Sequence, residues 1–572
     1  MSNSATSAAA EPGGEVWSAN LAAAIRAWRA RLGEAAVLVG ERATQSYGFS
    51  TIGLQRTVPA ALRPGCVDDV LAIVDIARTS GVALYPVSTG HNWGYGDAAP
   101  VTGSCVIVDL SALDRIVDMD AELGLVTLEP GVTQQKLKDF LDDKGLPFLV
   151  PTTGAGPHCS ILGNALERGY GITPYADHFG AVTALEAVLA DGRIYRSAVR
   201  ELGGQAVDRA FKWGIGPYLD GLFAQGNLGI VTRITIALAP RPERIEAFLF
   251  GVAHDAGLSA AVLAVRQILR NFKGITGSIN LMNARRVLAM IEPYPRARVG
   301  GSGILPAEVV AELADKNRIL PWTGLGVLYG NAGVVAAARR TIRRLLKPVA
   351  SRIAFITPGS ASLLNRLLGR VPRLRHGPIA GRARALDKSL RLVAGEPSEV
   401  ALPLAYWKST ARPAPEGNLD PARDGCGLIW YPPLVPMKPA SVTRYVELVS
   451  GICESYGIEP LITLTSLSDR CFDSSVPLLF DRRDADEARR AQSCYYALFE
   501  AGKREGFIPY RAAIHAMDHV IRRGTPFWDM VAAIKSAVDP EEIIAPGRYA
   551  PTGKSDGEQE RRARPSWAGV VE

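Results

Sequence analysis

The sequence predicts a fold that mixes helices and strands, of the α/β or α+β class, in two unlike parts. Elements of both kinds alternate through the first third of the chain, as in units built from a sheet covered by helices. After Pro240 the character shifts to helices mixed with alternating strands over residues 241–500, which indicates a second domain. The hydrophobic content of 47% and the charged content of 21% are those of an ordinary globular protein.

Helices are predicted where apolar residues recur at helical spacing. This spacing marks the segments 16–40 and 67–80. Thr133 has the side chain of a helix cap, and the helix after it is expected to run through Asp142. A last helix is expected around 526–538.

Strands are predicted where short apolar runs are bounded by turn residues. Such runs lie at 82–85, 105–110 and 125–128. Asp191-Gly192 is a strong hairpin signal between Val182–Ala190 and Arg193–Arg196. Residues 151–171 contain five glycines and little periodicity, so we expect an extended loop there.

Several classes of protein are disfavoured by composition. No run of about 18 apolar residues is present, so no membrane span is expected. The N-terminal segment lacks the basic start and apolar centre of a secretory signal. The seven cysteines are scattered without a CxxC pair, which argues against disulfides and a zinc site and favours a reducing cytoplasm. We therefore expect a cytoplasmic protein without a structural metal.

The net charge of +7 is concentrated in one segment. Residues 339–394 hold fourteen lysines or arginines against one acid, Asp387. One interpretation is a docking face for an acidic partner, and the other, which we favour, is a solvated basic surface. No zinc-finger, helix-turn-helix or RNA-binding signature accompanies it, so nucleic acid is not an expected partner.

The stretch PVSTGHNWGYG at Pro86–Gly96 is the most informative in the chain. It leaves a predicted strand and turns through Gly90, Gly94 and Gly96. Glycine permits positive φ angles and bares the backbone N–H groups, which makes such a loop a natural cradle for phosphate oxygens. The loop is therefore a candidate cofactor site, although a decorated turn would have the same spacing.

Six segments in chain order resemble the vanillyl-alcohol oxidase flavoprotein superfamily, whose cofactor domain is the FAD-binding PCMH-type domain. The likeness is strongest to its 4-alkylphenol-oxidising branch. The segments are STGHNWGYGDAAP (88–100), EPGVT (129–133), GNALERGYGITPYADHFG (163–180), GPYLDGLFAQGNLGIVT (216–232), PYR (509–511) and VDPEEIIAPG (538–547). Each alone is weak, but six in the family's order are specific.

The resemblance implies an α+β architecture, in which a two-subdomain PCMH-type domain binds FAD and an antiparallel-sheet-and-helix cap covers the flavin ring. The implied boundaries are an N-terminal tail and helix at 1–48, the FAD-binding domain at 49–240, the cap at 241–500, a C-terminal return at 501–552 and a flexible tail at 553–572.

The resemblance also implies the residues that hold the cofactor, because the family's loop matching Pro86–Asn92 wraps the FAD pyrophosphate. The implied cofactor-binding residues are Ser88, Thr89, Gly90, His91, Asn92, Gly163, Asn164, Gly229, Ile230 and Val231.

His91 is a departure from the phenol-oxidising members and matches a histidine of the berberine-bridge-like branch, where it is joined to the 8α-methyl carbon of FAD. One interpretation is therefore an 8α-histidyl bond between His91 and FAD. The other is a hydrogen bond from His91 to phosphate or backbone. Tyr431 in the cap is a weaker alternative tether, and Cys159 is not placed to supply a second one.

On the substrate side, Tyr95, Tyr510 and Arg511 match the two tyrosines and the arginine that bind a phenolate in the phenol branch. Asp177 matches the family's active-site acid near flavin N5. The alternatives are core packing for the tyrosines, a surface ion pair for Arg511 and a loop cap for Asp177.

The implied activity is FAD-dependent oxidation of a para-substituted phenol or aromatic alcohol by hydride transfer to flavin N5. His91 keeps a second hypothesis open, an oxidative tailoring enzyme acting on an alcohol, an amine or a cyclisable natural product. A non-enzymatic basic binding protein is the third and weakest. The electron acceptor is either molecular oxygen or an acidic protein, and the family implies a homodimer.

Overall fold

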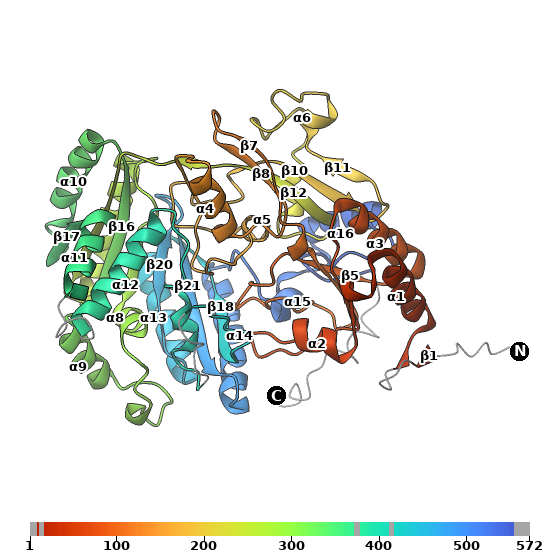
Figure 1. Ribbon diagram of the computed structural model, residues 1–572. Coiled ribbons are helices and arrows are strands. Elements are labelled where there is room, and N and C mark those ends of the chain that lie inside the picture. The colour runs from red at the N-terminus through yellow and green to blue at the C-terminus, as the bar shows by residue number, and fades with distance from the viewer. Residues whose placement is uncertain (1–8, 11–15, 371–377, 411–416, 554–572) are drawn as a thin grey trace, which may run out of the picture.

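The computed structural model describes residues 9–10, 16–370, 378–410 and 417–553. A four-stranded and a five-stranded sheet form from the first part of the chain, and an eight-stranded sheet forms from the middle part. The two smaller sheets lie on one side of the molecule and the large sheet lies on the other, with helices on their outer faces (Figure 1). The predicted α+β class is confirmed.

The four-stranded sheet is mostly parallel. Its order is β3 (Val37–Val39), β4 (Ala60–Leu62), β6 (Val106–Asp109) and β5 (Leu84–Val87). Only the pair of β3 and β4 is antiparallel. Helices α1 (Ala19–Leu32) and α3 (Val67–Ser80) pack together and bury Trp28 and Ile73 in the core of this sheet.

The helix predicted at 16–40 is shorter than expected. α1 ends at Leu32 because Gly33 adopts a φ of +86°, which a helix does not tolerate. A short turn leads from there into β3, so the apolar residues at 37–39 belong to a strand. The prediction for 67–80 is confirmed, since α3 has these bounds.

The five-stranded sheet is antiparallel. Its order is β11 (Ile194–Arg196), β10 (Val182–Leu189), β12 (Gly229–Ala237), β8 (Leu125–Leu128) and β7 (Ile116–Asp120). The hairpin predicted around Asp191-Gly192 is confirmed by the pairing of β10 with β11. Helix α4 (Gln134–Asp143) begins as predicted, because the Thr133 hydroxyl accepts a hydrogen bond from the Lys136 N–H at 3.1 Å.

The eight-stranded sheet is also antiparallel and lies within residues 241–500. Its order is β17 (Arg352–Ile356), β14 (Arg244–Val252), β16 (Trp322–Gly330), β15 (Asn280–Asn283), β20 (Thr463–Ser466), β21 (Cys471–Asp481) and β18 (Cys426–Tyr431), with β19 (Leu434–Pro436) paired to β21. Helices α7 (Leu258–Asn271), α10 (Ala332–Leu346), α13 (Pro439–Ser455) and α14 (Ala485–Glu505) supply the apolar side chains of its outer core.

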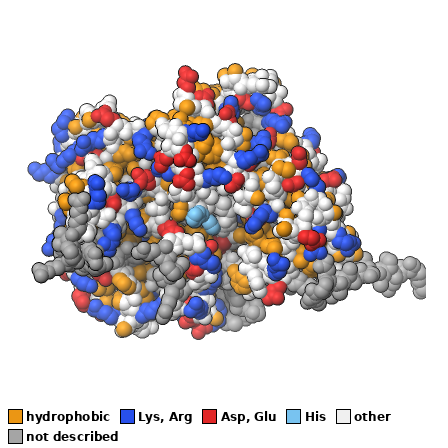
Figure 2. All heavy atoms as spheres, viewed as in Figure 1, with side chains coloured by type: hydrophobic (Ala, Val, Ile, Leu, Met, Phe, Trp, Pro, Cys, Tyr) orange, Lys and Arg blue, Asp and Glu red, His pale blue; other side chains and the backbone are white. Residues whose placement is uncertain are grey.

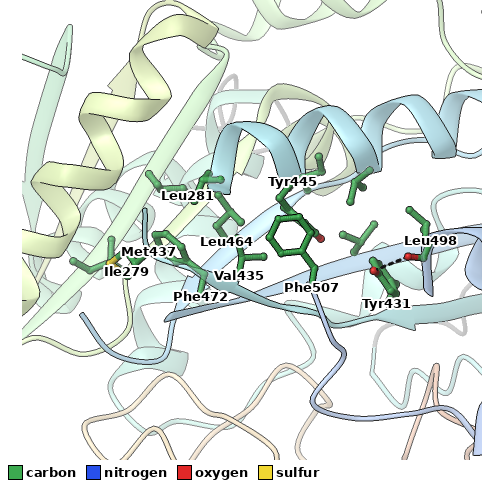
Figure 3. Packing of buried hydrophobic residues seen from close by; sticks show 14 of the residues in the cluster. Ile279, Leu281, Tyr431, Val435, Met437, Tyr445, Leu464, Phe472, Leu498 and Phe507 are labelled. Atoms are coloured by element: carbon green, nitrogen blue, oxygen red, sulfur yellow. Dashed lines mark hydrogen bonds between the residues drawn. The ribbon is translucent and has the colours of Figure 1, made fainter. Parts of the chain in front are cut away.

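The two faces of this cap sheet differ because side chains alternate along a strand. Leu281, Leu464 and Phe472 point into the core beneath the helices (Figure 3). Tyr431 also belongs to that core, where its hydroxyl donates to the Leu498 carbonyl at 2.9 Å (Figure 3). The weaker tether hypothesis for Tyr431 therefore loses its basis, because the hydroxyl lies on the helix side of the sheet.

The basic segment falls on α10, α11 (Pro358–Arg370) and α12 (Pro378–Val393), although residues 371–377 lie outside the described residues. Lys and Arg side chains gather at the end of the molecule where α10 lies (Figure 2). In the described part of the chain, no helix combines the length and the apolar character needed to cross a membrane. The remaining helices are α2 (Glu41–Tyr47), α5 (Ile161–Leu166), α6 (Ala198–Glu201), α8 (Ala284–Ile291), α9 (Ala307–Asn317), α15 (Met517–Val520) and α16 (Pro526–Val538).

The C-terminal segment returns to the four-stranded sheet after α16. Ile544 pairs in parallel with Leu84 of β5. The Lys535 ammonium, which is buried, donates to the Asp539 carboxylate at 2.5 Å and to the carbonyls of Asn227 and Ile544 at 2.6 and 2.8 Å. These bonds fix the returning segment between the two smaller sheets. The domain boundaries themselves stay a prediction.

We expect Lys535→Met to lower the free energy of unfolding by about 3–5 kcal/mol, because it leaves the Asp539 carboxylate buried without its counter-ion. Urea unfolding measures the loss. The matched control is Lys138→Met, which removes the ion pair with the half-exposed Asp142 at the same i, i+4 spacing and should cost less than about 1 kcal/mol. Equal small losses in both variants would contradict the role given to Lys535.

Candidate active site

A cavity of about 550 Å³ lies between the three sheets. Its first wall is β5 with the glycine-rich loop after it, and its second is formed by 153–170 and Gly226–Val231. The third wall is the inner face of the cap sheet, and the C-terminal return adds Tyr510 and Arg511. This volume is typical of sites for cofactors and small molecules.

The glycine-rich loop has the features of a phosphate cradle. Gly90 adopts a φ of +73°. Among the described residues, the backbone N–H groups of 89–92 donate to no protein acceptor, although this stretch lines the cavity. A side chain at Gly163 would collide with Ser88, since its Cβ would lie 2.3 Å from the Ser88 Oγ. Free N–H donors beside bare backbone fit the pyrophosphate of FAD.

Nine of the ten residues predicted to hold the cofactor line this cavity, namely Ser88, Thr89, Gly90, His91, Asn92, Gly163, Asn164, Gly229 and Val231. Ile230 is buried in the core of the four-stranded sheet and does not line the cavity. It alternates with Gly229 and Val231 along β12, so its side chain points the other way.

Two histidines next to the cofactor loops are neutral. Burial chiefly lowers the pKa of His91, and its Nδ1 has no hydrogen-bond partner in the described structure. The ring stacks on Trp93 with the centroids 4.8 Å apart. Burial also lowers the pKa of His178 to about 4, and its Nδ1 lies 2.6 Å from the Asn164 side-chain nitrogen. His178 therefore orients Asn164, while His91 keeps an unused ring nitrogen.

Arg511 and the two predicted tyrosines meet at one end of the cavity. The guanidinium stacks over the Tyr95 ring with 4.0 Å between the Cζ and the ring centroid, and it donates to the Asn92 side-chain oxygen at 2.7 Å. Burial raises the pKa of both Tyr95 and Tyr510, so both phenols stay protonated and can donate. Two hydroxyl donors beside a fixed cation suit a phenolate oxygen.

Glu167 is a residue of this site that the sequence analysis did not identify. It forms an ion pair with Arg548 and lies 3.6 Å from Arg511. Burial alone would raise the pKa of Glu167, but the two arginines outweigh burial and hold it below its ordinary value. In the sequence, Glu167 is marked only by its place in the family-like segment 163–180, where it lies in ALERGYG.

Asp177 does not lie where its predicted role requires. Its side chain is exposed and does not line the cavity. The carboxylate accepts a hydrogen bond from the Gly180 N–H at 2.8 Å and so closes a turn. The loop-cap alternative describes this geometry, and the assignment near flavin N5 finds no support in it.

Asp473 on β21 is a buried carboxyl group close to Tyr95 and Tyr510. Burial raises its pKa to about 7, which the Ser475 hydroxyl and Arg511 only partly offset. Its Oδ1 has no partner within the described residues. The acid also raises the pKa of Tyr510 and Tyr95, which shows that it lies near both. The sequence signal was weak, an acid followed by two serines in a strand of the cap.

Comparison with known proteins agrees with this geometry. Residues 58–198 match the family model of an FAD binding domain. The chain is 36% identical over 530 residues to 1'-carboxy-chondrochloren decarboxylase of Chondromyces crocatus, covering 92% of this chain and 96% of that protein. The chain belongs to the vanillyl-alcohol oxidase flavoprotein family.

Two further relatives of this flavoprotein act on cresols. This chain is 27% identical to the 4-cresol dehydrogenase [hydroxylating] flavoprotein subunit of Pseudomonas putida, and the match covers 92% of this chain and 94% of that subunit. A crystal structure of p-cresol methylhydroxylase with substrate bound matches with a TM-score of 0.83 and 26% identity, over 94% and 98% of the two chains. The flavoprotein is therefore an FAD-linked oxidoreductase.

Asp473 gives the flavoprotein a pH-dependent stability. In the folded protein the Asp473 carboxyl keeps its proton up to pH about 7, whereas in the unfolded chain an aspartate loses its proton near pH 4. The free energy of unfolding therefore falls as the pH rises between these two values, because the folded state binds more protons than the unfolded state there. We expect Asp473→Asn to unfold at the same free energy as the wild type near pH 4 and to be more stable at pH 8, by up to roughly 4 kcal/mol.

Urea unfolding of the two proteins from pH 4 to 8 measures this difference. The control is Asp486→Asn, an exposed acid on α14 whose change should be small at every pH. A constant difference between Asp473→Asn and the wild type across the range would contradict the raised pKa.

Proposed function

We propose that this flavoprotein oxidises a para-substituted phenol or a related aromatic alcohol. The observation that carries the proposal is the cluster of Arg511, Tyr95 and Tyr510 at one end of the cavity, with its stacked cation and two buried phenol donors. FAD, when bound, would accept a hydride from the first carbon of the substituent that lies para to the phenol oxygen. The likeness to the two cresol-oxidising relatives supports this choice of substrate.

The chain's own residues would hold the cofactor and polarise the substrate. We assign the pyrophosphate to the N–H groups of the loop 88–92, and the flavin side to Gly163, Asn164, Gly229 and Val231. Burial lowers the pKa of Arg511, but neighbouring groups, among them the Glu167 carboxylate, more than offset burial, so Arg511 stays charged. A fixed cation would stabilise the phenolate, which releases electrons toward the carbon that is oxidised.

We assign the proton-holding role at this end to Asp473 in place of Asp177. A carboxyl with a pKa of about 7 can keep or release a proton near neutral pH, which suits a general acid or base. It is buried beside the tyrosines, whereas Asp177 is exposed outside the cavity. While it holds its proton, the acid also places no negative charge against a bound phenolate.

We expect Arg511→Ala to slow the anaerobic bleaching of the flavin by 4-alkylphenols by roughly 100- to 1,000-fold, the effect of removing one preorganised charge donor. Stopped-flow absorbance measures the rate. Arg511→Lys should recover only part of it, because an ammonium cannot stack over Tyr95 and reach Asn92 as the planar fork does. The exposed Arg489→Ala is the control.

Unchanged bleaching in Arg511→Ala would remove Arg511 from the proposed role. If no 4-alkylphenol bleaches the wild-type flavin, and no phenolic inhibitor binds, the proposal of a phenol substrate fails as a whole.

A second candidate function is oxidative decarboxylation of a natural product, which the 36% identity to 1'-carboxy-chondrochloren decarboxylase favours. A phenol with a carboxylate on the second carbon of its para chain would lose a hydride from the first carbon and CO2 from the second. The electron pair of the broken carbon–carbon bond then forms the new double bond, so charge and atoms balance. The mass of the product distinguishes this outcome from simple oxidation.

We also propose that His91 is joined covalently to FAD. Its neutral ring carries an unpartnered Nδ1 inside the cavity, as a nucleophile needs. Bonding this nitrogen to the 8α-methyl carbon removes one hydrogen from each, and molecular oxygen takes the two electrons and two protons. The alternative, a hydrogen bond from His91 to phosphate, leaves the cofactor removable.

The test is acid precipitation of the purified protein. We expect the yellow colour to stay with the wild-type pellet and to move to the supernatant in His91→Ala, because only a covalent bond survives unfolding. Mass spectrometry of the intact chain should show the added mass of FAD in the wild type alone. The exposed His254→Ala serves as control, and flavin released from the wild type would refute the bond.

The partners and the location stay predictions. They comprise an electron acceptor that is either molecular oxygen or an acidic protein, a homodimer, and a cytoplasmic location. The exposed arginines of α10 are the surface on which an acidic acceptor would dock.

A further inference from the structure

Arg286 is a cation inside the cavity that has no counter-ion. Its side chain lines the cavity, and neither its Nε nor its Nη1 has a hydrogen-bond partner, although both atoms are shielded from solvent. In the described parts of the chain no acidic group pairs with it. Burial alone lowers its pKa to about 10, so it is still charged at neutral pH. A desolvated guanidinium without a partner is costly unless a ligand supplies the anion.

The local structure directs this side chain into the cavity. The Asn283 side chain caps α8 by accepting from the Arg286 N–H at 2.9 Å, which fixes the first turn. Arg285 precedes it and points elsewhere, because it forms a buried ion pair with Glu459 at 2.6 Å. Of two adjacent arginines, one is neutralised within the cap and the other is left facing the cavity.

The cap sheet lines the cavity with a row of residues on three neighbouring strands. Ser475, Thr463 and Met282 lie side by side on β21, β20 and β15, and all three line the cavity. Two strand spacings separate Ser475 from Met282, which is about 10 Å. Arg286 follows Met282 by four residues, in the first turn of α8, and lines the same cavity.

Other polar groups on the same wall lack partners. The Thr463 hydroxyl and the Asn280 side-chain oxygen are buried without hydrogen bonds in the described structure, and both residues line the cavity. A hydroxyl donor and a guanidinium that line the same cavity match the oxygens of a carboxylate. The residues assigned to FAD lie on the opposite walls, so the cofactor's phosphates are not the expected anion here.

We propose that Arg286, with Thr463, binds a carboxylate of the substrate, and that the substrate class is a para-substituted phenol with a short chain ending in an acid. This inference rests on the proposed function for the phenol end only. The phenol oxygen would lie at Arg511 and the carboxylate at Arg286. A phenol ring with two or three further carbons spans about the 10 Å between the two ends of the row.

The experiment measures binding to the holoenzyme by calorimetry, with probes that have no phenol and so test the acid site by itself. The probes are 3-phenylpropanoate and its uncharged amide. We expect the wild type to bind the acid at least roughly tenfold more tightly than the amide, and Arg286→Gln to lose roughly 10- to 100-fold in affinity for the acid alone. Arg286→Lys should retain part of the preference, and the exposed Arg340→Gln should retain all of it.

The same variants are then compared on 4-ethylphenol and 3-(4-hydroxyphenyl)propanoate. Arg286→Gln should raise KM for the acid and leave flavin reduction by 4-ethylphenol unchanged. Equal affinity of the wild type for acid and amide, or a preference that persists in Arg286→Gln, overturns the proposal. So does loss of FAD from Arg286→Gln, since it would assign the arginine to the cofactor. If no phenol reduces the flavin but the preference for the acid holds, the proposed function fails and the carboxylate site stands.

Discussion

The buried Lys535 ammonium is the contact on which the site depends most directly. By bonding to Asp539 and to the carbonyls of Asn227 and Ile544 at once, it joins the C-terminal return to the loop before β12. Asn227 and Ile544 both line the cavity, so these bonds hold part of its wall in place. A buried charge pair stabilises the protein only while every partner is in place. Loss of one partner would therefore destabilise the fold and the cavity wall together.

Three arginines that line the cavity give it a positive electrostatic character. Arg511 and Arg548 share one carboxylate, Glu167, whereas Arg286 has none within the described ranges. The nearby acid Asp473 carries a raised pKa and is neutral below pH about 7. The described residues around the cavity therefore carry an excess of positive charge. The anions that would neutralise it are the phosphates of the cofactor and the proposed acidic phenol. Complementary charge of this kind gives specificity as well as affinity.

Local structure was predictable wherever neighbouring residues decide it. The cap at Thr133, the hairpin at Asp191-Gly192 and the bounds of α3 follow from short-range hydrogen bonds, turn conformations and periodicity. The prediction failed at 16–40, where the helical spacing continues past Gly33 into a strand. Periodicity cannot separate a helix end from a following buried strand, because both bury apolar residues against the same core.

The sequence by itself determined the family, the glycine loop at 88–92 and the trio of Tyr95, Tyr510 and Arg511 that lines the cavity, since all of these lie in motifs that resemble the family's. Only the tertiary structure decided that Asp177 is outside the cavity. It alone also brought Arg286 to the cavity wall and buried Asp473 near Tyr95 and Tyr510, since both lie in the cap, where no motif marks them. Whether a strand or helix side chain faces a cavity or a core depends on which neighbours pack against each face, and those neighbours are distant in the chain.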